Sequence, residues 1–193
     1  MLFIVLGLAF IFITFEVPLV TGAEASQYID IFPDFVGYLI LWFRLEKTVS
    51  VNRWFKDSAT IAAGMLAVTF VQFLGSMSFL LPQNFMDSST FKFMGDIVNF
   101  IFSVGAPVIL ALNMVFVSFL CRGLGLSCED RKKEFLSTVF FVLTIVFFAL
   151  AAFAAVTLFI RNLPIQVWHI ALPAGVVFAV FALIGSRGVK ELE

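Results

Sequence analysis

The stretch Phe135–Ile160, FLSTVFFVLTIVFFALAAFAAVTLFI, contains no charged side chain. As a helix it is long enough to cross a bilayer, because roughly 20 apolar residues at about 1.5 Å per residue span the hydrocarbon core. The rest of the chain agrees: of its 193 residues, 62% are hydrophobic and 13% are charged, whereas an average soluble domain carries about 25% charged residues. The sequence therefore predicts an integral membrane protein.

Five further apolar segments accompany this stretch. Together the six predict an all-α, polytopic membrane protein with six transmembrane helices in a single domain. The predicted helices cover residues 2–20, 28–43, 58–81, 97–120, 135–160 and 167–185. The second segment is short for a span. The first is interpreted as a retained helix and not as a secretory signal, because no Lys or Arg precedes its apolar run.

The Lys and Arg residues orient these predicted helices. Most of the 12 fall between helices two and three, between helices four and five, or after helix six: Arg44, Lys47, Arg53, Lys56, Arg122, Arg131, Lys132, Lys133, Arg187 and Lys190. The opposite side receives only Lys92 and Arg161. Because cytoplasmic loops are enriched in these residues, both termini are predicted to be cytoplasmic. The same bias requires the short segment Tyr28–Phe43 to cross.

Most acidic residues stand where a predicted helix begins. A carboxylate there caps free N–H groups and meets the positive end of the helix dipole. The residues with this structural explanation are Asp30, Asp34, Asp57, Asp96 and Glu134.

Glu16 has no such explanation. It lies near the predicted outer end of the first helix, where the dipole disfavours an ionised carboxylate. We therefore expect it to be protonated, paired or turned toward water. His169, the single histidine, is predicted at the outer start of the sixth helix and is the specific candidate partner. Arg161 and Lys92 are the other candidates on that side.

Three amides, Gln72, Asn99 and Asn113, fall within the predicted spans. An amide in lipid needs a hydrogen-bond partner, and it serves either as a bond between helices or as the lining of a cavity. On the predicted outer side, acids outnumber Lys92 and Arg161; these acids are Glu16, Glu24, Asp30, Asp34, Asp87 and Asp96. The excess predicts a negative potential that favours a cationic solute or a proton.

Small residues recur every four positions in three of the predicted helices, which lets helix backbones approach closely in lipid. They are Ala59, Ala63, Ala67, Ala151, Ala155, Ala171, Gly175 and Ala179. These stripes favour packing inside the bundle, and a docking face for another subunit is the alternative. Pro107 and Pro173 are expected to kink the fourth and sixth helices.

Motifs of enzymes and metal sites are missing. The sequence has no HExxH, GxSxG, CxxC or phosphate-binding glycine-rich motif. Cys121 and Cys128 are expected to be reduced thiols in a cytoplasmic segment. We therefore predict no catalytic residue, no metal and no cofactor, and hence a protein that is not an enzyme and has no nucleic-acid partner.

The run Tyr28–Ile40, YIDIFPDFVGYLI, resembles a segment in a family of uncharacterised multi-pass membrane proteins, mostly from Gram-positive anaerobic bacteria. Family members carry an LPDFIGY-like run just after a first helix; Phe32 replaces the usual leucine here and Val36 the isoleucine. The resemblance covers about the first 80 residues and implies the bacterial cytoplasmic (inner) membrane, with no established activity. A weaker analogy, at the level of fold, links the chain to substrate-binding subunits of energy-coupling-factor vitamin importers.

The leading hypothesis is a membrane transport or small-solute-binding component with an outward-facing acidic pocket. Its predicted substrate-binding residues are Glu16, Asp34, Tyr38, Gln72 and His169. The expected partners are the lipid bilayer and a cationic or small polar solute. The alternative is a non-catalytic scaffold, sensor or accessory subunit that uses a small-residue face to contact another membrane subunit.

Overall fold

The computed structural model describes residues 2–12, 16–20, 27–30, 33–76, 89–130, 132–157 and 173–181. Its elements, in chain order, are α1 (Leu2–Phe12), β1 (Glu16–Val20), β2 (Gln27–Asp30), α2 (Asp34–Glu46), α3 (Arg53–Ser76), α5 (Ser89–Glu129) and α6 (Glu134–Thr157). A helical segment at residues 173–181 follows. The described chain is predominantly helical, as predicted, and it also contains a two-stranded sheet that was not predicted.

Within the described residues, three helices are long and apolar enough to cross a membrane. The spans are Arg53–Leu74 in α3, Val108–Glu129 in α5 and Glu134–Val156 in α6. Helices α1 and α2 contain 11 and 13 residues, which gives them lengths of only about 17 and about 20 Å. The described structure therefore contains three helices of spanning length and not the predicted six.

The prediction of a first helix over residues 2–20 is confirmed for α1 and is wrong from residue 16 on. Residues Glu16–Val20 form β1, which pairs antiparallel with β2. Pro18 lacks an N–H and would clash with the preceding turn of a helix, while β-branched Val17 and Val20 favour an extended backbone. The predicted second helix is also wrong at its start, because Gln27–Asp30 is a strand and α2 begins only at Asp34.

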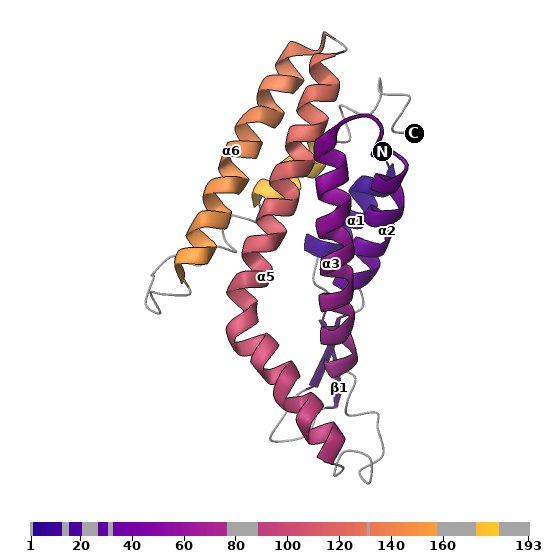
Figure 1. Ribbon diagram of the computed structural model, residues 1–193, viewed down its shortest axis with the longest axis vertical. Coiled ribbons are helices and arrows are strands. Elements are labelled where there is room, and N and C mark those ends of the chain that lie inside the picture. Colours follow the sequence, from indigo (N-terminus) through magenta and orange to yellow (C-terminus); the bar gives the residue numbers. More distant parts are fainter. Residues whose placement is uncertain are drawn as a thin grey trace.

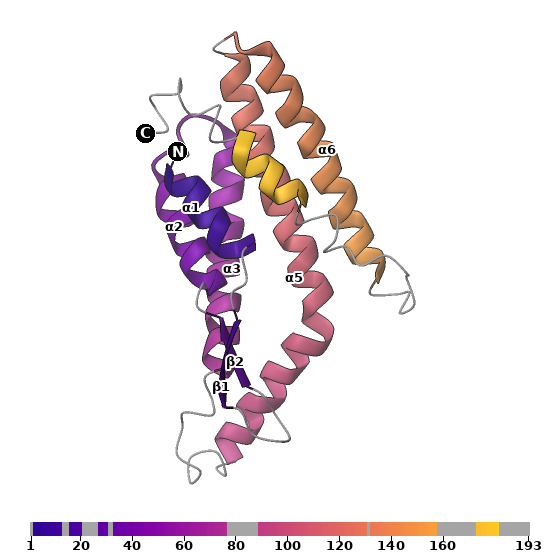
Figure 2. The same ribbon diagram turned by 180° about the vertical axis from the view of Figure 1, so that it is seen from behind.

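Figures 1 and 2 show how the elements are arranged. Helices α3, α5 and α6 run roughly along the long axis of the molecule. The turn between α2 and α3 and the turn between α5 and α6 lie toward the same end (Figure 1). The hairpin lies toward the other end, at the height of the lower parts of α3 and α5 (Figure 2). The main contacts join α5 to α6, α2 to α3, α1 to α2 and α3 to α5.

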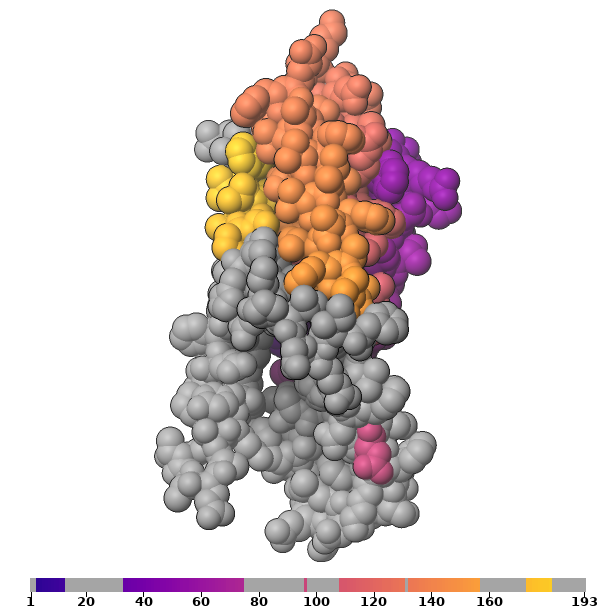
Figure 3. All heavy atoms as spheres, turned by 90° about the vertical axis from the view of Figure 1, so that its left-hand side faces the viewer, coloured from indigo at the N-terminus to yellow at the C-terminus, as the bar shows by residue number. Residues whose placement is uncertain are grey.

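The outer face of α6 is apolar. In Figure 3 this helix forms one face of the molecule, with the segment 173–181 beside it. Large side chains on this face are exposed, among them Phe135, Ile145 and Phe148. On the inner side, Phe140 and Phe147 are buried and pack edge-on against Phe178 of the last segment. A helix with apolar side chains on both faces is typical of a lipid-facing span.

Helices α1 and α2 cross at two glycines. A Cβ atom on Gly37 would lie 2.6 Å from the carbonyl oxygen of Gly7, and one on Gly7 would lie 2.9 Å from the carbonyl oxygen of Gly37. The two backbones are therefore in direct contact, which only residues without a side chain permit. This crossing fixes Tyr38, the next residue on α2, against the rest of the bundle.

Helix α5 extends past both ends of the predicted span 97–120. It contains 41 residues and continues through Pro107. The ribbon changes direction in the N-terminal half of α5, the half that contains Pro107 (Figure 1), as expected for a proline that removes a backbone hydrogen bond. Pro173 is the first described residue of the segment 173–181, so the predicted kink at this residue stays a prediction.

Three of the predicted helix caps are wrong. Asp30 lies in β2, and Asp96 is an exposed residue within α5, which begins at Ser89. Helix α3 begins earlier than predicted, at Arg53, and its cap is Asn52 and not Asp57. The other two acids, Asp34 and Glu134, do stand in the first turns of α2 and α6.

Asn52 also joins the α2–α3 turn to α5. Its side-chain oxygen accepts a hydrogen bond from the backbone N–H of Phe55 at 3.2 Å, and its amide nitrogen donates to the carbonyl of Gly123 at 3.1 Å. The Ser127 hydroxyl donates to the same carbonyl at 3.0 Å. Asp57 instead lies 3.6 Å from the guanidinium of Arg53. One amide side chain therefore both starts α3 and positions it on α5.

Candidate functional site

Tyr38 and Asn113 form a polar pair inside the helical bundle. Tyr38 is fully buried on α2, and its hydroxyl donates a hydrogen bond to the side-chain oxygen of Asn113 on α5. The tyrosine ring packs edge-on against Phe116, one turn further along α5, at a centroid distance of 5.8 Å. This bond links α2 to α5 through two residues that are 75 positions apart in the sequence.

Asp34 lies one turn before Tyr38 on the same face of α2. Between them, the ring of Phe35 packs against Phe70 and Phe73 of α3, at centroid distances of 5.3 and 5.0 Å. Gln72, which precedes Phe73 in the sequence of α3, is half-buried. The structure therefore places Asp34 and Tyr38 together on α2, while no described contact joins Gln72 to either.

Glu16 does not lie at the end of a helix, contrary to prediction. It is the first residue of β1, and its register partner in β2 is Asp30. Directly opposed residues of an antiparallel pair have Cβ atoms about 4.5–5.5 Å apart, and like charges there repel. The register of the hairpin therefore pairs two acidic residues, and Asp30 precedes Asp34 of α2 by four residues. His169 lies outside the described residues, so the predicted contact between Glu16 and His169 stays a prediction.

Sequence reasoning assigned Asn113 no part in the site, although it identified the residue as an amide that needs a partner. The partner is Tyr38, one of the predicted substrate-binding residues. The signal that was available is that an amide in an apolar span must find a hydrogen bond. Which side chain supplies this hydrogen bond depends on how α2 packs against α5.

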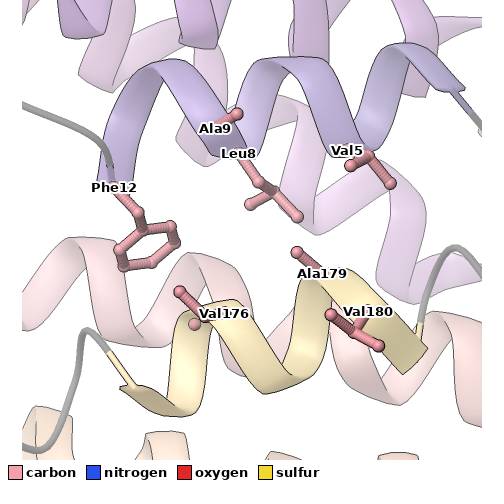
Figure 4. A pocket seen from close by; sticks show the side chains of 8 residues that line it. Val5, Leu8, Ala9, Phe12, Val176, Ala179 and Val180 are labelled. Atoms are coloured by element: carbon pink, nitrogen blue, oxygen red, sulfur yellow. The ribbon is translucent and has the colours of Figure 1, made fainter.

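A groove of about 230 Å³ lies between α1 and the segment 173–181. Figure 4 shows Val5, Leu8 and Phe12 of α1 facing Val176 and Val180. Gly175 lies against the Phe12 ring, where a Cβ atom would come within 3.2 Å of ring carbons. Every lining side chain is apolar, and none of the predicted site residues is among them. This groove suits acyl chains or another helix and not a cation.

Reactive groups do not converge in the described part of the chain. No group of three or more His, Cys, Asp or Glu residues there is arranged to hold a metal ion. Cys121 and Cys128 are buried on α5 without a disulfide. Cys121 lies among apolar core residues and is 0% exposed, which suits packing better than chemistry.

Any proposal about the function of this chain rests on the geometry of its own residues. The resemblance of the run Tyr28–Ile40 to a bacterial membrane family stays a prediction. Comparison with models of protein families, with characterised proteins and with solved structures finds no match to this chain.

Proposed function

We propose that this chain is a multi-pass protein of the bacterial cytoplasmic membrane that binds a small polar or cationic solute from the outer side, as a transport or solute-binding component. In this proposal the α2–α3 and α5–α6 turns face the cytoplasm. The two turns lie toward one end of the molecule (Figure 1), and the residues in and beside them include most of the Lys and Arg. Both features support this orientation.

Helices α3, α5 and α6 are the proposed spans, and both termini are proposed to be cytoplasmic. Helices α1 and α2 would enter from the cytoplasmic side, with the hairpin reaching the outer side between them. The predicted segment 167–185 would supply the last crossing.

The observation that carries the proposal is the position of the β-hairpin. It lies at the height of the lower part of α5, below the end of α6 (Figures 1 and 2), and the apolar span of α5 begins only at Val108. The outer edges of a two-stranded sheet leave N–H and C=O groups unpaired, which hydrocarbon does not tolerate. Backbone of this kind occurs at membrane depth only against protein or in a water-filled cavity. The hairpin therefore favours a hydrated region on the outer side.

Acidic residues continue from this region toward the Tyr38–Asn113 pair. Glu16 and Asp30 are register partners in the hairpin, and Asp34 follows at the start of α2. Such a series of carboxylates attracts cations and repels anions. We propose that Asp34, Tyr38 and Asn113 form the inner end of the binding region. Glu16, Gln72 and His169 are proposed to contribute from its outer part.

A thermal-unfolding screen of purified protein tests this proposal. Monovalent, divalent and organic cations and small polar solutes such as vitamins are each added, and a bound solute raises Tm because it stabilises only the folded state. The Asp34→Asn variant is expected to lose the shift. Asp57→Asn, which removes the same charge at the α2–α3 end, is expected to keep it. A screen without any stabilising solute, or an equal shift in Asp34→Asn, would contradict the proposal.

One observation favours the alternative of an accessory subunit. Thr60, Gly64 and Ala67 are exposed on one face of α3, and a Cβ atom on Gly64 would meet nothing within 4 Å. The Thr60 hydroxyl donates to the carbonyl of Lys56, so its polar group is already satisfied. A face of small residues allows another helix to approach closely. Replacing Gly64 with Leu would then abolish co-purification of a partner subunit while leaving solute-induced shifts in Tm unchanged.

A further inference from the structure

Arg44, in the last turn of α2, has a partly buried guanidinium. Its Nε and Nη2 atoms are buried, and neither has a hydrogen-bond partner in the part of the chain that the structure describes. The other described arginines differ, because Arg53 lies 3.6 Å from Asp57 and Arg122 lies over the ring of Phe141. A guanidinium keeps its charge at every physiological pH. Two buried donors without an acceptor are therefore costly unless an anion meets them.

Arg44 also lines a cavity of about 260 Å³. Lys47 adds a second cation to its wall, and the remaining lining residues are Phe3 of α1 with Ile40 and Phe43 of α2. Phe3 and Phe43 are 54% and 59% exposed. The wall of the cavity thus contains two cationic and three apolar side chains, which complement the phosphate and the acyl chains of an anionic phospholipid.

Two simpler roles for Arg44 explain less. A long basic side chain often extends its charged end into water while its stem covers apolar surface, but here two of the donors of the charged end are buried. A cation near the end of a helix also interacts favourably with the dipole. That interaction does not supply the missing hydrogen-bond acceptors.

We propose that this cavity binds the phosphate group of an anionic phospholipid of the cytoplasmic leaflet. In this proposal the Arg44 side chain turns its Nε–Nη2 edge, buried in the structure, toward the cavity, where this edge donates to two oxygens of one phosphate. Lys47 supplies a second charge for the headgroup, and Phe3 and Phe43 contact the beginning of the acyl chains. The cavity lies near the C-terminal end of α2, the end that carries the basic α2–α3 turn. Anionic headgroups gather at such basic surfaces. This site is separate from the proposed solute site.

The test compares thermal unfolding of the purified full-length protein in neutral detergent with three additions. These are phosphatidylglycerol, phosphatidylcholine and inorganic phosphate. Phosphatidylglycerol is expected to raise Tm, whereas the other two are expected to have little effect. Phosphatidylcholine carries the phosphate with a compensating cation, and inorganic phosphate lacks the acyl chains. Equal stabilisation by inorganic phosphate would overturn the assignment to a lipid.

Three variants locate the effect. Arg44→Gln and Lys47→Gln are expected to weaken phosphatidylglycerol binding about tenfold or more, as for a lost hydrogen bond to a charged group. Lys56→Gln removes the same charge from an exposed position just after the α2–α3 turn and is expected to bind as the unaltered protein does. An equal loss in Lys56→Gln would indicate unspecific attraction and overturn the proposal.

Stability without lipid gives an independent result. If no part of the protein neutralises Arg44, Arg44→Gln is as stable as the unaltered protein in lipid-free detergent, or more stable, because an unpaired charge has been removed. A clear loss of stability would show that Arg44 is already neutralised within the protein. That outcome would overturn the lipid site even if the variant still folds.

Discussion

At the scale of single residues, the interior of the bundle depends on a few polar groups that find partners. Tyr38 is fully buried, and its hydroxyl is satisfied by Asn113. Ser118 donates to the carbonyl of Thr144 on α6 at 3.0 Å, and the Thr69 hydroxyl donates to the carbonyl of Met65 within α3 at 2.7 Å. Where water is excluded, each such bond avoids the cost of an unsatisfied group.

Tyr38→Phe removes the hydroxyl and leaves the Asn113 oxygen without its donor. We expect a loss of stability of about 1–3 kcal/mol, measured by equilibrium unfolding in mixed detergent. Asn113→Leu should cost a similar amount because it leaves the hydroxyl unsatisfied, and the double variant should cost less than the sum of the two. Additive effects would show that the two side chains do not interact.

At the scale of elements, close packing decides where helices meet and how they start. The α1–α2 crossing exists because Gly7 and Gly37 both lack a side chain. The start of α3 depends on Asn52, whose amide also reaches α5. Neither role follows from residue type alone, because the same chain contains glycines and amides that have no such contact.

Gly37→Ala is expected to destabilise the protein, because the new Cβ would lie 2.6 Å from a backbone oxygen of α1 and 2.8 Å from the Ile11 side chain. Overpacking of this kind costs about 1–3 kcal/mol. Gly64→Ala is the matched control: it meets open space, and the gain in helix propensity is up to about 1 kcal/mol. Unfolding in detergent should separate the two variants, and similar stabilities would contradict the crossing.

Asn52→Ala is expected to cost about 1–2 kcal/mol, since it removes a helix cap and a bond to the Gly123 carbonyl. Asp57→Asn should cost well under about 1 kcal/mol, because it breaks only an ion pair whose arginine side chain is 88% exposed. The same unfolding assay tests both. A larger loss of stability in Asp57→Asn than in Asn52→Ala would contradict the assignment of Asn52 as the cap of α3.

At the scale of the whole molecule, the two described basic turns lie toward one end and the hairpin toward the other (Figure 1). The sequence predicts two membrane crossings between the α2–α3 turn and the α5–α6 turn. Two crossings return the chain to the same side, which agrees with the position of both turns toward one end. The short helices α1 and α2 do not reach as far as α3 or α5, and the hairpin follows where they stop. Helices therefore make up the described bundle at the end with the basic turns, whereas the other end also contains the non-helical backbone of the hairpin.

This arrangement predicts the sidedness of two exposed positions. Ser50→Cys in the α2–α3 turn and Glu129→Cys at the end of α5 should react with a membrane-impermeant maleimide from the same side of the membrane, which is the cytoplasmic side in the proposed orientation. Both positions are exposed, whereas the native Cys121 and Cys128 are buried and should react slowly. If the two positions were labelled from opposite sides, α3 and α5 could not be two helices that cross the membrane in opposite directions, and the arrangement would be refuted.

Composition and hydropathy by themselves predicted a membrane protein and located α3, α5 and α6, the described helices that are long and apolar enough to cross a membrane, because the length and apolarity of a segment depend on the solvent that it requires. Only the tertiary structure decided that Glu16 lies in a strand opposite Asp30, that Asn113 meets Tyr38, and that Asn52 caps α3. An apolar run predicts burial or lipid contact but does not distinguish a helix from a buried strand. The stretch Phe135–Ile160 remained helical over its described length because nothing interrupts it, while Leu2–Val20 contains Pro18 and changes to a strand before it.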